Sequence, residues 1–341
     1  MPTGEEADNE GIRATPKPDC DLCGATGSQL HGDLSDRDYG APGRWAVMHC
    51  GSCGFCWIDP RPRDEEIGRL YAAYHTHERV ERGSLFVRAV RVALSSRLLG
   101  YRDARLSRAE SGFALLIGWI GPLRELARHA SLWLPAARRG ELLDVGCGAG
   151  AFLVQMRELG WSVRGLDTDP GAVATAREQL GDVSVTQAAI EDLEPATAQF
   201  DAITLSHVIE HLPDPARSLA HCARLLRPGG WIVIATPNSR SLGARHFGRD
   251  WRGWEPPRHL QVFDGQTLAK LAERAGLHVL RSFTVSASAY FIWLASSRSQ
   301  SLRVRLSGLV FWARAYALTL LGRDCGEEVV VIAERPGDLG R

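Results

Sequence analysis

The stretch that decides the fold runs from residue 140 to residue 150 and reads Gly-Glu-Leu-Leu-Asp-Val-Gly-Cys-Gly-Ala-Gly. Its apolar part, Leu142 to Val145, is typical of a strand that is buried on both faces. The glycines that follow predict a tight turn into a helix that ends at Gly160. Such a turn lets a ligand lie directly against backbone N–H groups at the N-terminus of the helix.

A second predicted strand, Ser162 to Leu166, follows the helix and ends at Asp167. In nucleotide-binding βαβ units, a carboxylate at about this distance after the glycine turn accepts hydrogen bonds from the ribose hydroxyls. The two strands, the turn and the acid therefore predict a nucleotide-binding unit.

The spacing of the glycines distinguishes between nucleotides. A dinucleotide-binding turn has the pattern G-x-G-x-x-G, whereas this chain has Gly146-x-Gly148-x-Gly150 with Asp144 two residues ahead. This pattern resembles the first motif of the class I S-adenosylmethionine-dependent methyltransferases. The resemblance covers roughly residues 140–285, returns at 327–336, and continues through four further segments: residues 165–170, Phe200-Asp201, residues 210–215 and residues 225–230. An NAD-binding domain is the alternative, but it would need the third glycine at another offset.

The resemblance implies an α/β fold, with a Rossmann-like, mostly parallel sheet of seven strands, and S-adenosylmethionine as the cofactor. It places the amino-acid part of the cofactor on the glycine turn and the ribose on Asp167. Either Glu191 or Asp192 would meet the adenine, and both stay open. The full set of expected cofactor-binding residues is Asp144, Gly146, Cys147, Gly148, Gly150, Asp167, Thr168, Glu191, Asp192 and Ser206.

Composition limits the partners and the location of the chain. Its 341 residues contain 40 Lys+Arg and 40 Asp+Glu, so the formal net charge is zero. The chain therefore lacks the excess of positive charge that would favour nucleic acid as a partner. Residues 1–18 are polar, carry no signal-peptide pattern and are expected to form a disordered leader. We expect a cytoplasmic protein without a transmembrane span, since no uncharged stretch of spanning length occurs.

Four cysteines predict a structural zinc site. Cys20-x-x-Cys23-Gly24 and Cys50-x-x-Cys53-Gly54 are two knuckles, in which the glycine lets the backbone curl so that both sulfurs face one point. Four thiolates suit tetrahedral Zn²⁺ and leave no open position for catalysis. Residues 20–75 resemble the zinc-ribbon module of a subset of class I methyltransferases, many of which act in natural-product or cell-surface sugar pathways, and we expect the module to span residues 19–78. The module would shape the substrate entrance or brace the catalytic domain.

Two apolar, arginine-rich segments flank the nucleotide-binding unit. Residues 79–138 predict a helical cap or linker, and a second helical insert is expected at about 289–322 within a methyltransferase domain at 139–341. Both could simply cover the open edge of the sheet, which is the interpretation we favour. They could also receive a lipid, a membrane face or an anionic, carrier-bound substrate.

Two histidines are candidates for a general base. His259 lies in a loop with unusual side chains at residues 251–260 and is the first choice, although it could only close the loop by hydrogen bonding. His207 follows the strand 200–205, at the edge where open α/β sheets bind ligands, and is the second choice. Arg258 would bind an anionic group or pair with Glu255. The expected substrate-contacting residues are His211, Trp251, Trp254, Arg258 and Tyr290.

These observations predict transfer of a methyl group to oxygen or carbon of a small molecule, of secondary-metabolite or sugar type, by in-line displacement. Such a reaction depends mainly on aligning the reactants in a dry pocket. One alternative is an enzyme of the same fold that binds the cofactor but catalyses a rearrangement or a cyclisation. Another is a nucleic-acid methylase or binding module, which the balanced charge disfavours.

Overall fold

The computed structural model describes residues 7–71, 98–101, 121–181, 184–194, 199–299 and 301–337. Most of the helical cap expected at 79–138 lies outside these residues, as do residues 1–6 of the expected leader. Within 121–138 the structure contains helix α4 (Gly121–Ala130) and a short 3-10 turn, η2 (Ala136–Arg138).

The described residues form a seven-stranded central sheet, which confirms the predicted fold class. Its order is β13-β14-β11-β10-β7-β8-β9. Within this sheet β14 runs antiparallel to both of its neighbours and the other strands run parallel to one another. The strands are β7 (Glu141–Val145), β8 (Ser162–Asp167), β9 (Val185–Gln187), β10 (Phe200–Ser206), β11 (Leu226–Pro237), β13 (His278–Val285) and β14 (Glu328–Glu334).

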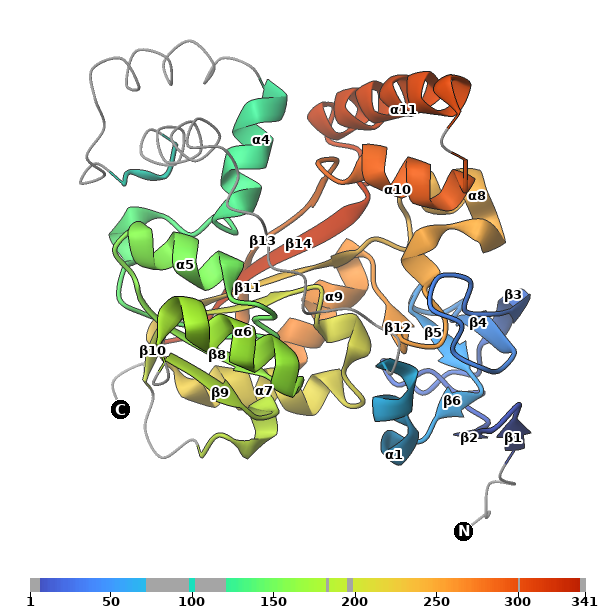
Figure 1. Ribbon diagram of the computed structural model, residues 1–341, viewed down its shortest axis with the longest axis horizontal. Coiled ribbons are helices and arrows are strands. Elements are labelled where there is room, and N and C mark those ends of the chain that lie inside the picture. Colours follow the sequence, from blue (N-terminus) through green and yellow to red (C-terminus); the bar gives the residue numbers. More distant parts are fainter. Residues whose placement is uncertain are drawn as a thin grey trace.

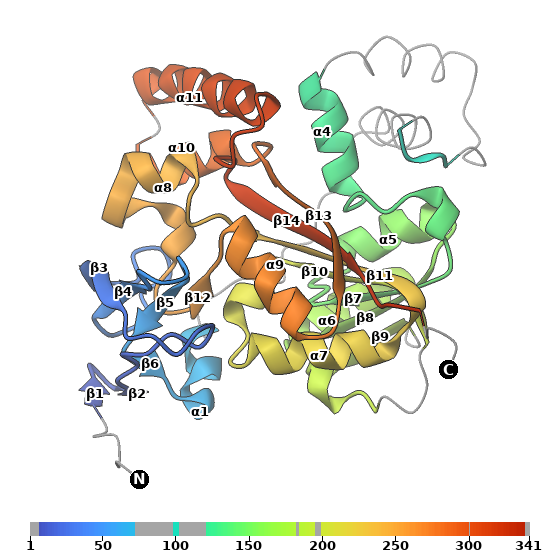
Figure 2. The ribbon, with the colours of Figure 1, turned by 180° about the vertical axis from the view of Figure 1, so that it is seen from behind.

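Helices cover both faces of this sheet (Figure 1, Figure 2). One face packs on α5 (Ala151–Glu158) and α6 (Pro170–Leu180) through Leu153, Met156 and Val173. The other packs on α7 (Pro215–Leu225) and α9 (Gly265–Arg274) through Leu219, Cys222 and Leu268. Aspartate side chains cap three of these helices by accepting backbone N–H bonds at their N-termini: Asp169, Asp214 and Asp264. Because the strands other than β14 run parallel to one another, their carboxyl ends meet at one edge of the sheet.

The amino-terminal module contains two small sheets. Strands β3 (Ser28–Leu34), β4 (Trp45–His49) and β5 (Cys56–Asp59) belong to the larger one. The smaller one has the order β1-β2-β6, with β1 at Ala7–Asn9, β2 at Ile12–Thr15 and β6 at Arg61–Pro62. The described part of the module closes with α1 (Asp64–Ile67) and η1 (Gly68–Tyr71).

The expectation of a disordered leader was wrong for residues 7–15. Strands β1 and β2 occupy this segment, and β2 pairs with β6. Ile12 and Ala14 alternate with polar residues, and both are buried in the core of the module. An alternating pattern of this kind forms a strand when a sheet is present to receive its apolar face.

The module and the catalytic domain share one core. Strand β12 (Gln261–Val262), which lies far along the chain, pairs with β5 and completes the larger sheet. Trp251, Trp254 and Leu260 are buried in the same cluster as Ile12 and Trp45. The boundary expected near residue 78 therefore does not separate two independent cores.

The predicted insert consists of two helices between β13 and β14. They are α10 (Ala289–Ser297) and α11 (Leu302–Leu320), and they lie side by side at the top of both views (Figure 1, Figure 2). None of the helices in the described part of the chain is both long enough and apolar enough to cross a bilayer.

Candidate active site and metal site

The glycine turn joins β7 to α5 in left-handed backbone conformations. Gly146, Gly148 and Gly150 have φ angles of 69°, 53° and 83°. A Cβ atom at Gly146 would lie 2.4 Å from Cγ2 of Val208, whereas one at Gly148 would meet nothing within 4 Å. The turn therefore needs glycine for close packing at Gly146, and it leaves open space beside its backbone at Gly148.

Two acids flank this turn, as expected. Asp167 accepts hydrogen bonds from the backbone N–H groups of Gly148 (2.8 Å) and Asp169 (2.9 Å). Asp144 is buried and accepts a bond of 2.6 Å from the Thr204 hydroxyl. Burial raises the pKa of Asp167 and raises that of Asp144 to about 7. An acceptor carboxylate and free space beside a backbone amide fit the ribose and the amino-acid part of a nucleoside cofactor.

The remaining cofactor candidates lie around the same edge of the sheet. Cys147 is buried, and its N–H donates to the carbonyl oxygen of Leu166. Ser206 is the last residue of β10, and Thr168 directly follows β8. Their contacts with a cofactor stay predictions.

The two acids of the turn η4 (Ile190–Asp192) have different partners. Glu191 accepts a hydrogen bond from the Ser218 hydroxyl on α7. Asp192 accepts one of 2.9 Å from the Ala189 N–H and so closes its own turn. The choice between Glu191 and Asp192 for the adenine stays open.

His207 occupies the carboxyl end of β10 with a left-handed backbone, φ 55°. Residues other than glycine adopt this conformation at a cost, and functional sites are where such residues cluster. The side chain is 46% exposed, and its ring lies between two buried carboxylates. Nδ1 is 3.5 Å from Glu210 Oε1, and Nε2 is 3.7 Å from Glu328 Oε1.

These carboxylates set the charge of the histidine. Removal of water from around the ring would by itself lower the pKa of His207. The nearby carboxylates of Glu210 and Glu328 have a larger, opposite effect and raise this pKa well above its usual range. Conversely, burial alone would raise the pKa of Glu210, and its contact with His207 lowers it to about 2. His207 therefore becomes a base only as pH rises through its raised pKa.

The sequence analysis missed Glu328 and His129. Glu328 begins β14, and its Oε2 accepts a hydrogen bond of 2.7 Å from His129 Nε2 on α4. The two residues lie 199 positions apart in the chain. A signal for Glu328 existed, because it directly precedes the apolar run Val329–Ala333 of this strand, but nothing in the sequence paired it with His129.

His259 is placed less favourably for catalysis than expected. Its side chain is buried, and Nδ1 donates to the carbonyl oxygen of Gly253 over 2.8 Å. Burial lowers the pKa of His259 to about 4. A histidine with such a low pKa, whose ring already donates a hydrogen bond to the backbone, is a weak base for removing a proton at neutral pH. The order of the two histidines is therefore reversed in our assignment, and His207 becomes the first candidate.

His211 links His259 to the amino-terminal module. Its Nδ1 lies 2.9 Å from the Tyr71 hydroxyl and 3.1 Å from the carbonyl oxygen of Arg258, and its ring packs edge-on against His259. Ligand atoms of Glu210, His211 and His259 lie within 4.8 Å of one another. These residues already have protein partners, among them the Thr236 hydroxyl, which donates to Glu210. We interpret them as a hydrogen-bonded cluster that positions the site.

Three residues expected to contact substrate are buried with internal partners. Within residues 251–260, here called the lip, Trp251 Nε1 donates to Glu327, and Trp254 Nε1 donates to the carbonyl oxygen of Gly248. Arg258 Nη1 and Nη2 bond Asp36 at 2.7 and 3.1 Å, and Nε bonds Glu255 at 2.9 Å. These hydrogen bonds and the burial disfavour Trp251, Trp254 and Arg258 as substrate contacts, and their assignment to substrate stays a prediction. Arg258 holds the lip against the module through Asp36, and its contact with Glu255 is the pairing expected as the alternative for this arginine.

Tyr290 lies in a different part of the structure. It is half-buried in α10, where its ring lies beside Gly308 of α11. Its contact with substrate stays a prediction.

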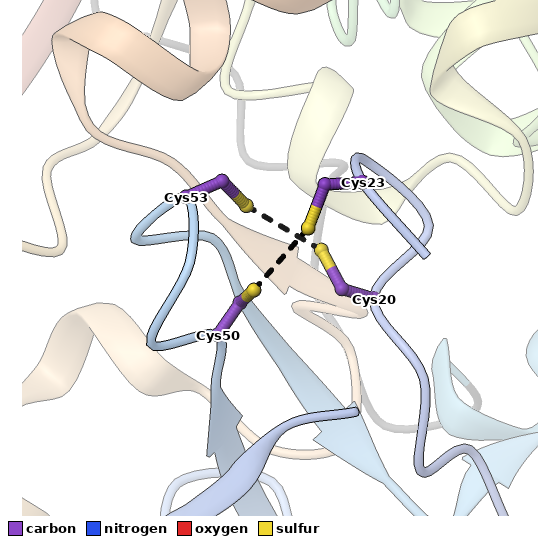
Figure 3. A group of neighbouring side chains, drawn as sticks. All are labelled: Cys20, Cys23, Cys50 and Cys53. Atoms are coloured by element: carbon purple, nitrogen blue, oxygen red, sulfur yellow. Dashed lines mark hydrogen bonds between the residues drawn. The ribbon is translucent and has the colours of Figure 1, made fainter. Parts of the chain in front are cut away.

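The four cysteines of the two knuckles converge on one point (Figure 3). Their sulfur atoms all lie within 4.8 Å of one another, with Cys20 and Cys53 at 3.6 Å and Cys23 and Cys50 at 3.4 Å. In a tetrahedral site with Zn–S bonds of about 2.3 Å, the sulfurs would be about 3.8 Å apart. The cluster thus has the donor set and the size for one zinc ion.

The two knuckles have the same backbone geometry. In each, the glycine after the second cysteine donates its N–H to the carbonyl oxygen of the first cysteine, at 2.8 Å for Gly24 and 2.9 Å for Gly54. Both glycines have left-handed φ angles, 78° and 83°. This repeated turn explains why a Cys-x-x-Cys-Gly sequence points its two thiols to one side.

The fold and the glycine–acid pair define a nucleotide-binding α/β protein of the Rossmann-like class. Residues 122–282 match the family model described as "Methyltransferase domain". The chain is 38% identical over 169 residues to the ubiquinone biosynthesis O-methyltransferase of Thiobacillus denitrificans, covering 46% of this chain and 72% of that protein. The enzyme of the same name from Xanthomonas oryzae is 39% identical over 124 residues, covering 35% of this chain and 51% of that enzyme.

The chain thus belongs to the class I S-adenosylmethionine-dependent methyltransferases. Among solved structures, it resembles an S-adenosylmethionine-dependent methyltransferase from Archaeoglobus fulgidus. That protein is 21% identical, covering 70% of this chain and 99% of the other, with a TM-score of 0.44. The chain spans only about half the length of several of the curated relatives that it matches.

Proposed function

We propose that this enzyme methylates a hydroxyl oxygen of a small molecule. The names of its relatives favour oxygen over carbon as the acceptor atom. Secondary-metabolite and sugar-type molecules remain within the proposed acceptor class, including anionic or carrier-bound ones. The observation that carries the proposal is the position of His207. It is half-exposed at the carboxyl end of β10, and the neighbouring Val208 packs against the glycine turn.

In this proposal the glycine turn, Asp144 and Asp167 hold the cofactor, which when bound supplies an electrophilic methyl group on its sulfonium. In its neutral form, which is present as pH rises through its pKa, His207 removes the hydroxyl proton of the acceptor. Glu210 and Glu328 orient the ring and stabilise the imidazolium that results. Proton removal by a positioned histidine contributes about 10²–10⁴-fold to a rate.

The test is turnover with hydroxylated acceptors. Purified enzyme is incubated with S-adenosylmethionine and a panel of phenols, sugars and other alcohols, and the products are analysed by mass spectrometry. Stoichiometric formation of S-adenosylhomocysteine and an O-methylated product supports the proposal. Conversion of an acceptor without S-adenosylhomocysteine would instead indicate a rearrangement or a cyclisation.

The amino-terminal cysteines form the second part of the proposal. Cys20, Cys23, Cys50 and Cys53 hold one structural Zn²⁺ with no open coordination position. Two identical knuckle turns and the sulfur separations support this assignment. The ion would brace the module against which the lip is packed.

Alanine at Gly148 is expected to weaken cofactor binding without unfolding the protein. The added methyl group would enter the open space beside the turn, where we place the cofactor. Gly181→Ala is the matched control, since Gly181 also has a positive φ and nothing within 4 Å of its Cβ position. Each variant should lose about 1 kcal/mol of stability from backbone strain. Calorimetry should show a loss of affinity for S-adenosylmethionine of about tenfold or more in Gly148→Ala alone; equal affinities would contradict the assignment.

Glutamine at Glu328 is expected to move the pH profile of the enzyme. A neutral His207 is needed to accept a proton, so kcat/KM should rise as pH increases through the pKa of His207. Removing one of the two carboxylates that raise this pKa should shift the rise by about one pH unit to lower pH. Glu334→Gln, at the other end of β14 and in contact with the exposed His278, is the control that should leave the profile unchanged. An unshifted profile for Glu328→Gln would argue against His207 as the base.

A further inference from the structure

Helix α11 exposes one continuous apolar face. Leu302, Leu306 and Leu309 follow helical spacing, and they are 72%, 55% and 51% exposed. Val310 and Leu320 extend the same face and are 70% and 69% exposed. Single exposed apolar residues are common on protein surfaces, but a continuous face of this length marks an interaction site.

The opposite side of α11 is firmly packed, so the exposed face has a defined orientation. Phe311 and Ala315 are buried, and the ring of Phe311 lies 4.8 Å from that of Trp293 on α10. Trp293 Nε1 also donates to the carbonyl oxygen of Val304 over 3.0 Å. Figure 1 and Figure 2 show α11 on the outside of α10.

The charge of this hairpin is entirely positive. Residues 289–322 contain four arginines and no aspartate or glutamate. Arg303 and Arg314 flank one border of the apolar face, and Arg305 flanks the other, as follows from 100° per residue along the helix. Apolar residues bordered by arginines match a bilayer whose headgroups are negatively charged. A symmetric pairing of two copies would instead bring like charges together.

The hairpin is joined directly to the candidate active site. Ser296 at the end of α10 accepts a hydrogen bond of 3.0 Å from the N–H of Arg252 in the lip. His246 of α8 (Leu242–Phe247), just before the lip, stacks on Trp293, with ring centroids 5.1 Å apart. The chain that follows α11 enters β14 at Glu328, the partner of His207. A surface to which the hairpin binds would therefore lie close to the carboxyl edge of the central sheet, where we place the reaction of the acceptor.

We propose that the α10–α11 hairpin docks the enzyme on a bilayer that contains anionic phospholipid. The apolar face of α11 enters the interface between headgroups and acyl chains, and the arginines contact the phosphates. The helix lies on the membrane and does not cross it. This proposal goes beyond methyl transfer and does not depend on the identity of the acceptor.

Vesicle cosedimentation tests the proposal with phosphatidylcholine vesicles, prepared with and without phosphatidylglycerol. Wild-type enzyme should bind the anionic vesicles at least about tenfold more tightly than the neutral ones, and salt should weaken this binding. The double variant Leu306→Ser/Val310→Ser should lose about tenfold or more of the affinity. Arg303→Gln and Arg314→Gln should each lose about fivefold.

Leu30→Ser is the matched control, because Leu30 is a 45% exposed leucine on β3 of the amino-terminal module. It should bind vesicles like the wild type, and circular dichroism should show that every variant is folded. Methyl transfer to a water-soluble acceptor should be unchanged in all of them, which separates this test from that of the proposed function. The proposal is overturned if wild type ignores anionic vesicles or if the double variant binds equally well. A dimer in solution that the double variant dissociates, without vesicle binding, would assign the face to a second copy of the chain.

Discussion

Replacing Cys50 by serine is expected to release the zinc ion and to unfold the amino-terminal module. Structural zinc binding in zinc-finger peptides is worth about 10–16 kcal/mol at neutral pH, and this binding energy is largely folding energy. Removing one of four thiolates leaves an incomplete site around an ion that prefers four ligands. We expect wild-type protein to contain one zinc per chain by atomic spectroscopy, and Cys50→Ser to contain much less.

The effect should extend into the catalytic domain. Cys20, Cys50 and Trp57 are buried in the same cluster as Phe263 and the strands of the central sheet. Loss of the metal should therefore lower the midpoint of thermal unfolding and abolish methyl transfer, because the lip loses its support.

Cys56→Ser is the matched control for this experiment. Cys56 is a buried thiol on β5, close to the knuckle but outside the cluster of four. Its replacement should keep the zinc and cost about 1–3 kcal/mol for a buried hydroxyl. A Cys50→Ser protein with full zinc content, or an unchanged unfolding midpoint after chelation of the wild type, would refute the zinc site.

Asparagine at His207 is expected to reduce kcat by about 10²–10⁴-fold. Asparagine tolerates the left-handed backbone at this position better than most residues, and it can still form hydrogen bonds. It has no basic nitrogen, so it cannot take the proton that the neutral form of His207 accepts. Affinity for S-adenosylmethionine, measured by calorimetry, should stay within a factor of about three of the wild-type value because the glycine turn is untouched.

Two further variants control this result. His278→Ala removes an exposed histidine that also contacts a glutamate, and it should leave kcat unchanged. His259→Asn tests the buried alternative and is expected to affect stability more than the chemical step. If His207→Asn kept most of the wild-type kcat while His259→Asn lost it, the base would be His259.

Local patterns predicted the central part of the fold well. The run Leu142–Val145, the glycines after it and the acid at the end of the next strand are close in sequence. Their geometry follows from strand burial and from backbone freedom at glycine. The cysteine cluster was equally predictable, because each knuckle is built from five consecutive residues.

Features that depend on distant partners were not predictable in this way. The burial of Arg258 depends on Asp36, which lies 222 positions earlier. The raised pKa of His207 depends on Glu328, and the strand pairing of residues 12–15 depends on β6. A single sequence contains the polar side chains but not the information on which of them will meet, so the contact of the lip with the module through Arg258 and Asp36 was not predicted.

The shared core between the amino-terminal strands and β12 has a consequence for protein engineering. A shortened version that starts at α4 would leave Trp251, Trp254 and Val262 without their covering layer and would precipitate during expression. Chimaeras with other enzymes should succeed only when residues 7–71 and 238–264 are exchanged as a set. For the same reason, residues in these two segments are expected to change together during evolution, although most of the nucleotide-binding fold separates them in the sequence.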